Sequence, residues 1–362
     1  MNITYLPSAY LINGLRNLED IKRVESNFFL RAVRIENNSS NRIQLNQYRF
    51  DIQRDSKTLK TIIYNEEMIK KKAEDVSNLI DALAHPDLAK FFLGTAEFWK
   101  KENLSLNELE QNQETGLRLE HFVYMDKEPV NQLKFTVFYT ENYEEKIEEI
   151  VIPLKQYTSK NDYKFPLRGA WIPVNTSDNP YEHRRMHSQE FGFDLVKVDK
   201  DMNLSSNSGK KNEMFSYYGE EVIAIADGVI IDSFDQLPDN PAAGEFLPEE
   251  DLGKTINESG YLPVAAGNYI VIEHPGKEFS FYAHLIPNSL KVKNGEKIKQ
   301  GQVIGFLGNS GNSTAPHLHF HLMQGPDPLA ARGLPCKFSN LTGLEGEKVE
   351  FLNKNFSIVY TD

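Results

Sequence analysis

The segment Pro316–Leu322 constrains this chain most, because it alternates histidine with apolar residues. Such alternation is typical of a β-strand, in which successive side chains point to opposite faces. We therefore expect His317, His319 and His321 to share one face, directed outward at intervals of about 6–7 Å, while the apolar face packs on a core. Imidazole is the commonest metal ligand and titrates near neutrality, so this strand indicates metal or acid–base chemistry.

The other histidines fall mainly in the same part of the sequence. Only two of the nine, His85 and His121, lie in the first half, and we interpret His121 as a structural histidine on a strand. The later stretch adds His183, His187, His274 and His284 to the three histidines of the alternating strand.

Composition excludes several classes of protein. At about 150 residues per domain, 362 residues predict two domains, or three small ones. Lys and Arg total 40 against 52 Asp and Glu, and the net charge of −12 disfavours general nucleic-acid binding. The single cysteine, Cys336, allows no intramolecular disulfide and no cysteine-based zinc knuckle. No apolar run approaches the roughly 18 residues of a membrane span, and no signal-peptide pattern opens the sequence.

The first half predicts a β-sandwich-like domain over about 1–160, with a helical insertion at about 66–112 and no evident function. Alternating apolar residues predict strands over 29–35, 43–52, 117–123, 133–139 and 150–154, with a bulge near Asn46. Within the insertion, helical spacing predicts one helix that ends at His85-Pro86 and a second over about 88–99. Ser105 and Glu108 form a capping-box pattern that predicts a third helix.

The second half predicts an almost wholly β domain over about 166–335, after a boundary between about 156 and 180. Asp227-Gly228 and Pro275-Gly276 are turn signals between strands, which favours antiparallel sheet. The segment 235–267 reads as a solvated surface insertion or as the wall of a cleft. Residues 336–362 form a tail with one further possible strand.

The histidine strand needs partners if it is to hold a catalytic zinc ion, because such sites use three protein ligands and leave one position open for water. Asp194 is the best carboxylate candidate, since a lone acid is out of place in the strand-like run 191–196 unless it is bound. His183 and His187 precede it on a short stretch, and His284 ends another strand pattern. Each also has an ordinary structural interpretation.

Several ordered motifs of the second half resemble the lysostaphin-type (LytM-like) zinc metallopeptidases. The resemblance covers roughly residues 168–335, and it rests on Gly267–His274, Tyr282–Leu285, Gly301–Gly305, Gly308–Gly311 and Ser313–Phe320. It implies a compact, mostly antiparallel β-fold with zinc in an open groove. It also implies cleavage of peptide bonds in the stem or cross-bridge peptides of peptidoglycan.

The resemblance implies roles for individual residues. His319 and Asp194 correspond to zinc ligands, and His284 and His317 to catalytic histidines. Many members carry the remaining ligand four residues before the aspartate, where this chain has Glu190.

The remaining zinc ligand is therefore either His183 or His187. His183-Arg184 followed by Ser188-Gln189 is similar to one branch of the family, which favours His183. His321 stands where the family commonly has an acidic residue. Three interpretations are open: it lies beside the metal ligands, it faces the substrate, or it is a neutral replacement.

Two alternatives to an enzyme remain at this stage. A non-catalytic relative would keep the zinc site and bind peptidoglycan or activate a hydrolase. The glycine and valine spacing of 292–308 also suits the half-barrels of lipoyl-type carriers and sugar-phosphotransferase proteins, although no suitably placed lysine is present. A peptidoglycan substrate implies an extracytoplasmic or secreted location, with which the absence of a signal-peptide pattern is in tension.

Overall fold

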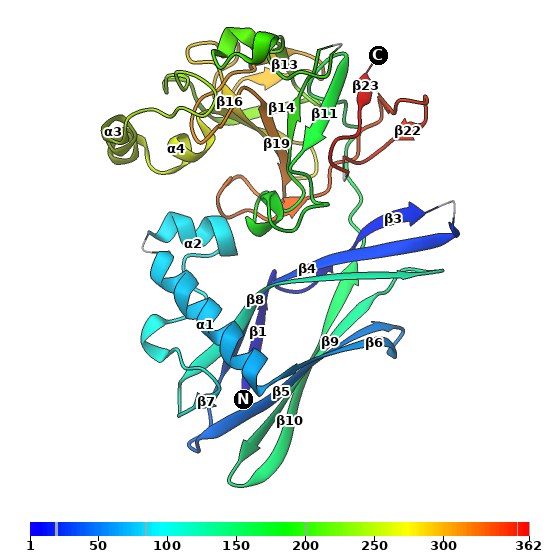
Figure 1. Ribbon diagram of the computed structural model, residues 1–362, viewed down its shortest axis with the longest axis vertical. Helices are drawn as coiled ribbons and strands as arrows, with labels where there is room; N and C mark the ends of the chain where they lie inside the picture. The colour runs from blue at the N-terminus through cyan, green and yellow to red at the C-terminus, as the bar shows by residue number, and fades with distance from the viewer. Residues whose placement is uncertain (19–20, 84, 200, 353, 362) are drawn as a thin grey trace. The chain divides into compact units, whose positions relative to one another are not determined.

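The computed structural model describes every residue of the chain except 19–20, 84, 200, 353 and 362 (Figure 1). Contacts divide the chain into two compact units, Met1–Tyr157 and Thr158–Asp362. Each unit has its own sheets and its own apolar core. No helix among the described residues is long and apolar enough to cross a bilayer.

The N-terminal unit contains two mainly antiparallel sheets. In one, β4 is flanked by β1 and β3 and also pairs with β8; the other has the order β2-β10-β9-β5-β6, with β7 paired to β5. The register of β5 against β9 shifts between Leu45 and Gln47, which confirms the predicted bulge near Asn46. The strands are β1 (Asn2–Leu6), β2 (Leu11–Ile12), β3 (Gly14–Leu18), β4 (Arg23–Glu36), β5 (Ile43–Arg54), β6 (Lys57–Asn65), β7 (Glu108–Leu109), β8 (Glu114–Asp126), β9 (Gln132–Glu141) and β10 (Glu144–Lys155).

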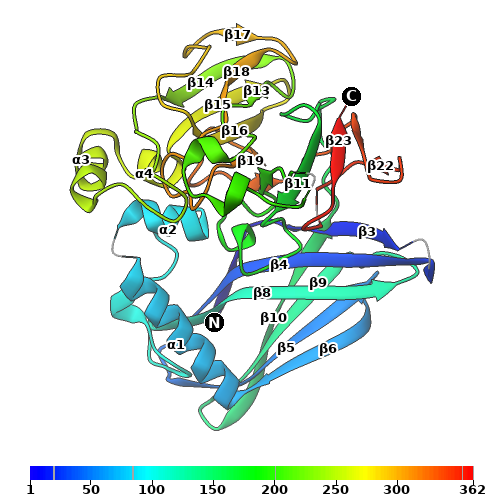
Figure 2. The ribbon, with the colours of Figure 1, turned by 45° about the horizontal axis from the view of Figure 1, so that its top comes forward.

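Aromatic side chains join the two sheets of this unit. The ring of Phe50 on β5 lies 5.3 Å from that of Phe122 on β8, in the other sheet, and 4.7 Å from that of Phe135 on β9. Figure 2 shows β4 and β8 lying over the strands of the second sheet. The predicted β-sandwich-like architecture is confirmed, because one buried apolar cluster draws on both sheets.

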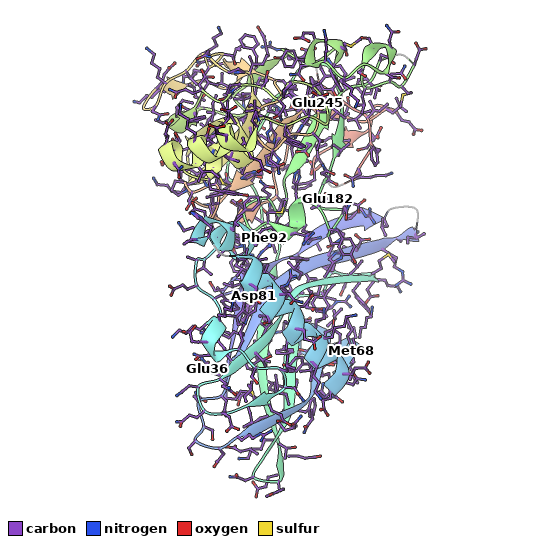
Figure 3. All side chains as sticks on the ribbon, turned by 60° about the vertical axis from the view of Figure 1, so that its left-hand side comes forward. Glu36, Met68, Asp81, Phe92, Glu182 and Glu245 are labelled. Atoms are coloured by element: carbon purple, nitrogen blue, oxygen red, sulfur yellow. The ribbon has the colours of Figure 1, made fainter. Side chains whose placement is uncertain are left out.

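Two helices and a short 3₁₀ turn interrupt the strands: α1 (Glu66–Ala82), α2 (Pro86–Leu93) and η2 (Lys101–Asn103). The Asn65 side chain accepts a hydrogen bond from the backbone N–H of Met68 and caps α1, and His85 caps α2 in the same way. Figure 3 labels Met68 and Asp81 near the two ends of α1 and Phe92 in α2.

Of the helices predicted for this insertion, one is confirmed only in its first half and one is wrong. The helix predicted over 88–99 ends at Leu93, because Gly94 adopts a left-handed conformation (φ 78°) that terminates it. No helix begins at Ser105: its hydroxyl donates to the backbone carbonyl of Glu108, where β7 begins, instead of accepting from a backbone N–H as a helix cap does.

The C-terminal unit is built on a large sheet of antiparallel pairs. Its order is β17-β14-β15-β16-β19-β12-β11-β23-β21-β22, with β20 paired to β19, and β13 pairs separately with β18. The strands are β11 (Ala170–Val174), β12 (Phe193–Val196), β13 (Glu221–Ile223), β14 (Gly228–Phe234), β15 (Asn268–His274), β16 (Glu278–Leu285), β17 (Lys297–Ile298), β18 (Val303–Phe306), β19 (Leu318–Met323), β20 (Gly333–Leu334), β21 (Leu341–Thr342), β22 (Lys348–Val349) and β23 (Val359–Thr361).

The predicted turn at Pro275-Gly276 connects the hairpin of β15 and β16, and Gly276 takes a left-handed φ of 77° there. β19 contains most of the alternating histidine segment and lies between β16 and β12. Its apolar face, Leu318, Phe320 and Leu322, is buried as predicted. His319 and His321 on the other face are buried too, contrary to the outward orientation predicted, because Phe281 of β16 packs against both rings. His317, just before β19, is only partly buried.

The segment 235–267 is not a simple loop, since it contains α3 (Glu249–Ser259) and α4 (Leu262–Ala266). No residue of α3 is fully buried, and its apolar face consists only of the partly covered Leu252 and Ile256, one turn apart. α4 contributes Ala266 to an apolar cluster with Val271 and Phe281. Figure 3 labels Glu245, just before α3.

Candidate metal centre

Asp194 and His319 form the base of the candidate site. They lie on adjacent antiparallel strands, and the register of β12 and β19 places them directly opposite each other. The Nδ1 atom of His319 is 2.9 Å from Oδ1 of Asp194. Both side chains are buried, and the Asn175 amide donates to Oδ2 of Asp194 at 2.8 Å. The pairing of two strands therefore sets the relative position of a carboxylate and an imidazole.

His183 approaches the same carboxylate from a short 3₁₀ turn, η3 (His183–Arg185). Its Nε2 is 3.5 Å from Oδ2 of Asp194, and its ring lies 4.6 Å from that of His319. The neighbouring Arg184 is buried and faces Glu190 at 3.9 Å, which ties this turn to the segment that leads into β12. Figure 3 labels Glu182, the residue before the turn.

These three side chains fit a zinc ion. One donor atom from each of His183, Asp194 and His319 lies within 4.8 Å of the others. Tetrahedral zinc with bonds of about 2.0–2.1 Å places its ligand atoms about 3.3–3.5 Å apart, close to the observed separations. All three ionic contacts found for Asp194 among the described residues are with histidines, so this buried carboxylate has no lysine or arginine to balance it. Two imidazoles and one carboxylate leave one tetrahedral position for water, as a catalytic site requires.

His284 and His317 form a second pair beside this group, with ring centroids 4.5 Å apart. Nδ1 of His284 donates to the carbonyl of Ser310 at 2.7 Å, and Nδ1 of His317 donates to that of Ala315 at 2.8 Å. With Nδ1 protonated in both rings, each Nε2 is left to exchange a proton.

The backbone of His284 explains how its side chain reaches the site. Ala283 pairs with His319, so regular alternation along β16 would turn His284 to the opposite face. Instead His284 adopts a left-handed φ of 63°, and its ring lies 6.1 Å from that of His319. Such strain in a non-glycine residue persists only where surrounding contacts impose it, and it clusters at functional sites.

Burial and mutual charge shape the pKa values of the site. Burial alone would raise the pKa of Asp194, but the imidazoles of His183, His317 and His319 hold it well below its usual range. Burial lowers the pKa of His319 to about 4 and that of His284 well below its usual value. Burial opposes the charge on His317, but the Asp194 carboxylate raises its pKa. Asp194 is therefore ionised and His319 neutral at pH 7, which are the states a metal ion requires.

Buried amides and hydroxyls hold the loop that carries the carbonyl partners of the His284–His317 pair. The Asn240 amide donates to the carbonyls of Gly311 and Ser313, both at 2.9 Å. The Ser313 hydroxyl bonds Asn309 and lies 3.1 Å from Nδ1 of His317. Sequence reasoning assigned no role to Asn175 or Asn240, because a lone asparagine carries no pattern that distinguishes it from a turn residue.

Comparison with known proteins relates part of the C-terminal unit to a peptidase family. The sequence profile of peptidase family M23 matches residues 253–331. ShyA, a peptidoglycan DD-endopeptidase of Vibrio cholerae, is 44% identical over 66 residues, which make up 18% of this chain and 15% of ShyA. Lysostaphin of Staphylococcus staphylolyticus is 44% identical over 72 residues, or 20% of this chain and 14% of lysostaphin. Residues 253–331 thus match an M23 peptidase domain, and we call the C-terminal unit that contains them the M23 unit.

Among solved structures, the catalytic domain of lysostaphin from Staphylococcus simulans aligns with 49% of this chain and 88% of that domain, at 23% identity and a TM-score of 0.23. The matched part of the M23 unit contains His284, His317 and His319 but neither His183 nor Asp194. The chain spans only about a seventh of the length of ShyA and of lysostaphin.

The M23 unit brings together five of the six residues predicted for its site: His183, Asp194, His284, His317 and His319. His187 is the exception: it is buried and lies outside the three-residue metal group found among the described residues, and its carbonyl accepts from the backbone N–H of Gly333. Glu190, at the position where the family often has a ligand histidine, instead faces Arg184.

Proposed function

We propose that this protein is a zinc-dependent endopeptidase that hydrolyses peptide bonds in the stem or cross-bridge peptides of peptidoglycan. The observation that carries the proposal is the group of His183, Asp194 and His319 next to the His284–His317 pair. The relatives are named as a peptidoglycan DD-endopeptidase, a glycyl-glycine endopeptidase and lysostaphin, which supports peptidoglycan peptides as the substrate class.

The residues have distinct tasks in this proposal. His183, Asp194 and His319 would hold the zinc ion. When bound, zinc polarises a scissile carbonyl and lowers the pKa of the attacking water to about 7. Nε2 of one histidine of the His284–His317 pair accepts the proton of that water, and the other, when it is protonated on both nitrogens, donates from Nε2 to the developing oxyanion. The carbonyls of Ser310 and Ala315 hold the Nδ1 proton of each ring, so that Nε2 is the nitrogen that gains or loses a proton.

The test is the release of new amino termini from purified peptidoglycan. We expect the zinc-loaded protein to release them from at least one wall chemotype, and His319→Ala to release none while its circular dichroism stays unchanged. A protein that binds one equivalent of zinc but is inert on every chemotype would reject the enzyme and leave a non-catalytic binding or activating relative.

A further inference from the structure

His321 is the one histidine of the β19 face without a task in the proposed reaction. It follows His319 by two residues and therefore lies on the same face of the strand. Only 1% of its surface is exposed, and its ring lies 4.8 Å from that of Phe281 on the neighbouring β16. A side chain covered in this way cannot contact a peptide substrate, so the substrate-facing interpretation of His321 is wrong.

The contact that His321 makes is with His319. Its Nδ1 atom lies 2.8 Å from Nε2 of His319, so one ring donates and the other accepts. The other nitrogen of His319, Nδ1, lies 2.9 Å from Oδ1 of Asp194, which is a member of the same candidate metal group. When Nδ1 gives its lone pair to a cation, the single ring proton of His319 must be on Nε2. His319 is then the donor and Nδ1 of His321 the acceptor.

We propose that His321 is a positioning residue that accepts this hydrogen bond and holds His319 in the tautomer and orientation that direct Nδ1 to the metal. A histidine ligand usually donates its second N–H to such an acceptor, which raises the basicity of the ligating nitrogen. The inference rests on the proposed zinc site.

A second feature of His321 supports this role. Accepting at Nδ1 requires the neutral His321 to carry its proton on Nε2. This nitrogen is buried and has no hydrogen-bond partner among the described residues. An unpartnered buried polar group destabilises a fold, and a leucine would fill the same space without that cost. The bond to His319 is the contact that a leucine could not make.

Two substitutions separate this hydrogen bond from simple packing. In His321→Asn, the side-chain oxygen occupies nearly the position of Nδ1 and keeps an acceptor. In His321→Leu, the volume is similar but the acceptor is gone. Zinc affinity is measured on the full chain by competition with a chelator of known affinity. The thermal midpoint of the metal-free protein and the visible spectrum of the cobalt(II)-substituted protein serve as independent readouts.

We expect His321→Leu to bind zinc about 10–100-fold more weakly and to change the cobalt spectrum, while its metal-free midpoint stays the same or rises. His321→Asn should restore zinc affinity to within about threefold of the original protein. Unchanged affinity in His321→Leu, or equal weakening in both variants, would overturn the inference.

Failure of the enzyme proposal would look different. A protein that binds zinc and cleaves no peptidoglycan leaves these affinity measurements intact, and they still decide the role of His321. A chain that binds no zinc would overturn both proposals.

Discussion

His121 in the N-terminal unit and His319 in the C-terminal unit show how differently the two units use the same residue on a strand. His121 lies on β8, and its Nε2 is 2.7 Å from Oδ1 of Asn27 on the neighbouring β4. His319 lies on β19 and contacts groups from β12, from the turn η3 and from its own strand. A position on a strand is thus not enough to make a histidine a candidate metal ligand. His319 is one because side chains from several chain segments meet at it.

The two units also differ in the groups that surround a buried carboxylate. Glu120 on β8 is buried against the Lys72 ammonium and the Tyr64 hydroxyl, so a fixed cation balances its charge. Asp194 is equally buried but faces imidazoles and one amide. A carboxylate without a fixed cation favours an added one, which is the physical difference between a structural ion pair and a metal site.

The largest effect should come from removing a ligand of the C-terminal unit. We expect His183→Ala to lose stoichiometric zinc and to lower peptidoglycan cleavage by about 10³-fold or more. His187→Ala is the matched control from the same segment, and it should keep zinc and activity within about threefold. Zinc content is measured by atomic absorption and cleavage by the release of amino termini, for both variants. Loss of zinc and activity in His187→Ala but not in His183→Ala would make His187 the ligand.

Removal of the catalytic pair should separate chemistry from metal binding. We expect His284→Ala and His317→Ala to lower kcat by about 10²–10⁴-fold while each keeps one zinc ion, because neither belongs to the metal group. Loss of zinc from either variant would show that the pair helps to hold the ion.

A core substitution in the N-terminal unit should affect stability and leave the metal centre alone. Phe50 packs against Phe122 and Phe135, so Phe50→Ala should lower the free energy of unfolding of this unit by about 3–5 kcal/mol.

The chain offers a clean reporter for that measurement, since its two tryptophans, Trp99 and Trp171, lie one in each unit. In a Trp171→Phe background, urea unfolding followed by fluorescence reports Trp99 alone. Zinc content in native buffer should not change, and a loss of zinc would mean that the units are not independent in stability.

The smallest effect concerns a largely covered carboxylate at a strand end of the N-terminal unit. Hydrogen bonds from Lys146, Ser39 and Asn41 lower the pKa of Glu141 to about 2. Because the folded pKa lies below the unfolded one, this stabilisation is present above about pH 4.5 and is lost as the pH falls toward 2. Glu141→Gln should therefore lower the thermal midpoint near pH 6 and match the original protein near pH 2. An equal difference at both pH values would contradict the assignment.

The prediction of individual elements succeeded where the signal was local. The bulge near Asn46 follows from a shift in the alternation of apolar residues, and the turn at Pro275-Gly276 follows from a residue pair that favours turns. Each signal lies within a few residues. The helix predicted at Ser105 was wrong because the same hydroxyl can donate to a carbonyl as readily as it can cap a helix. α3 was missed because Leu252 and Ile256 are its only aliphatic side chains, too few to form a recognisable apolar stripe.

The sequence by itself determined that His319 and its neighbours lie on a strand with a buried apolar face, since alternation is a property of the extended backbone. It also limited the ligand set to a few residues, through ordered motifs and a carboxylate in an apolar run. Only the tertiary structure decided which of them meet. The register of β12 against β19 places Asp194 opposite His319, and the turn η3 brings His183, rather than His187, next to these two side chains. The left-handed backbone of His284 reverses the face that alternation predicts. The contact between Asp194 and His319 joins residues 125 positions apart, and His284 meets His319 from a different strand, so no local pattern carries information on either contact.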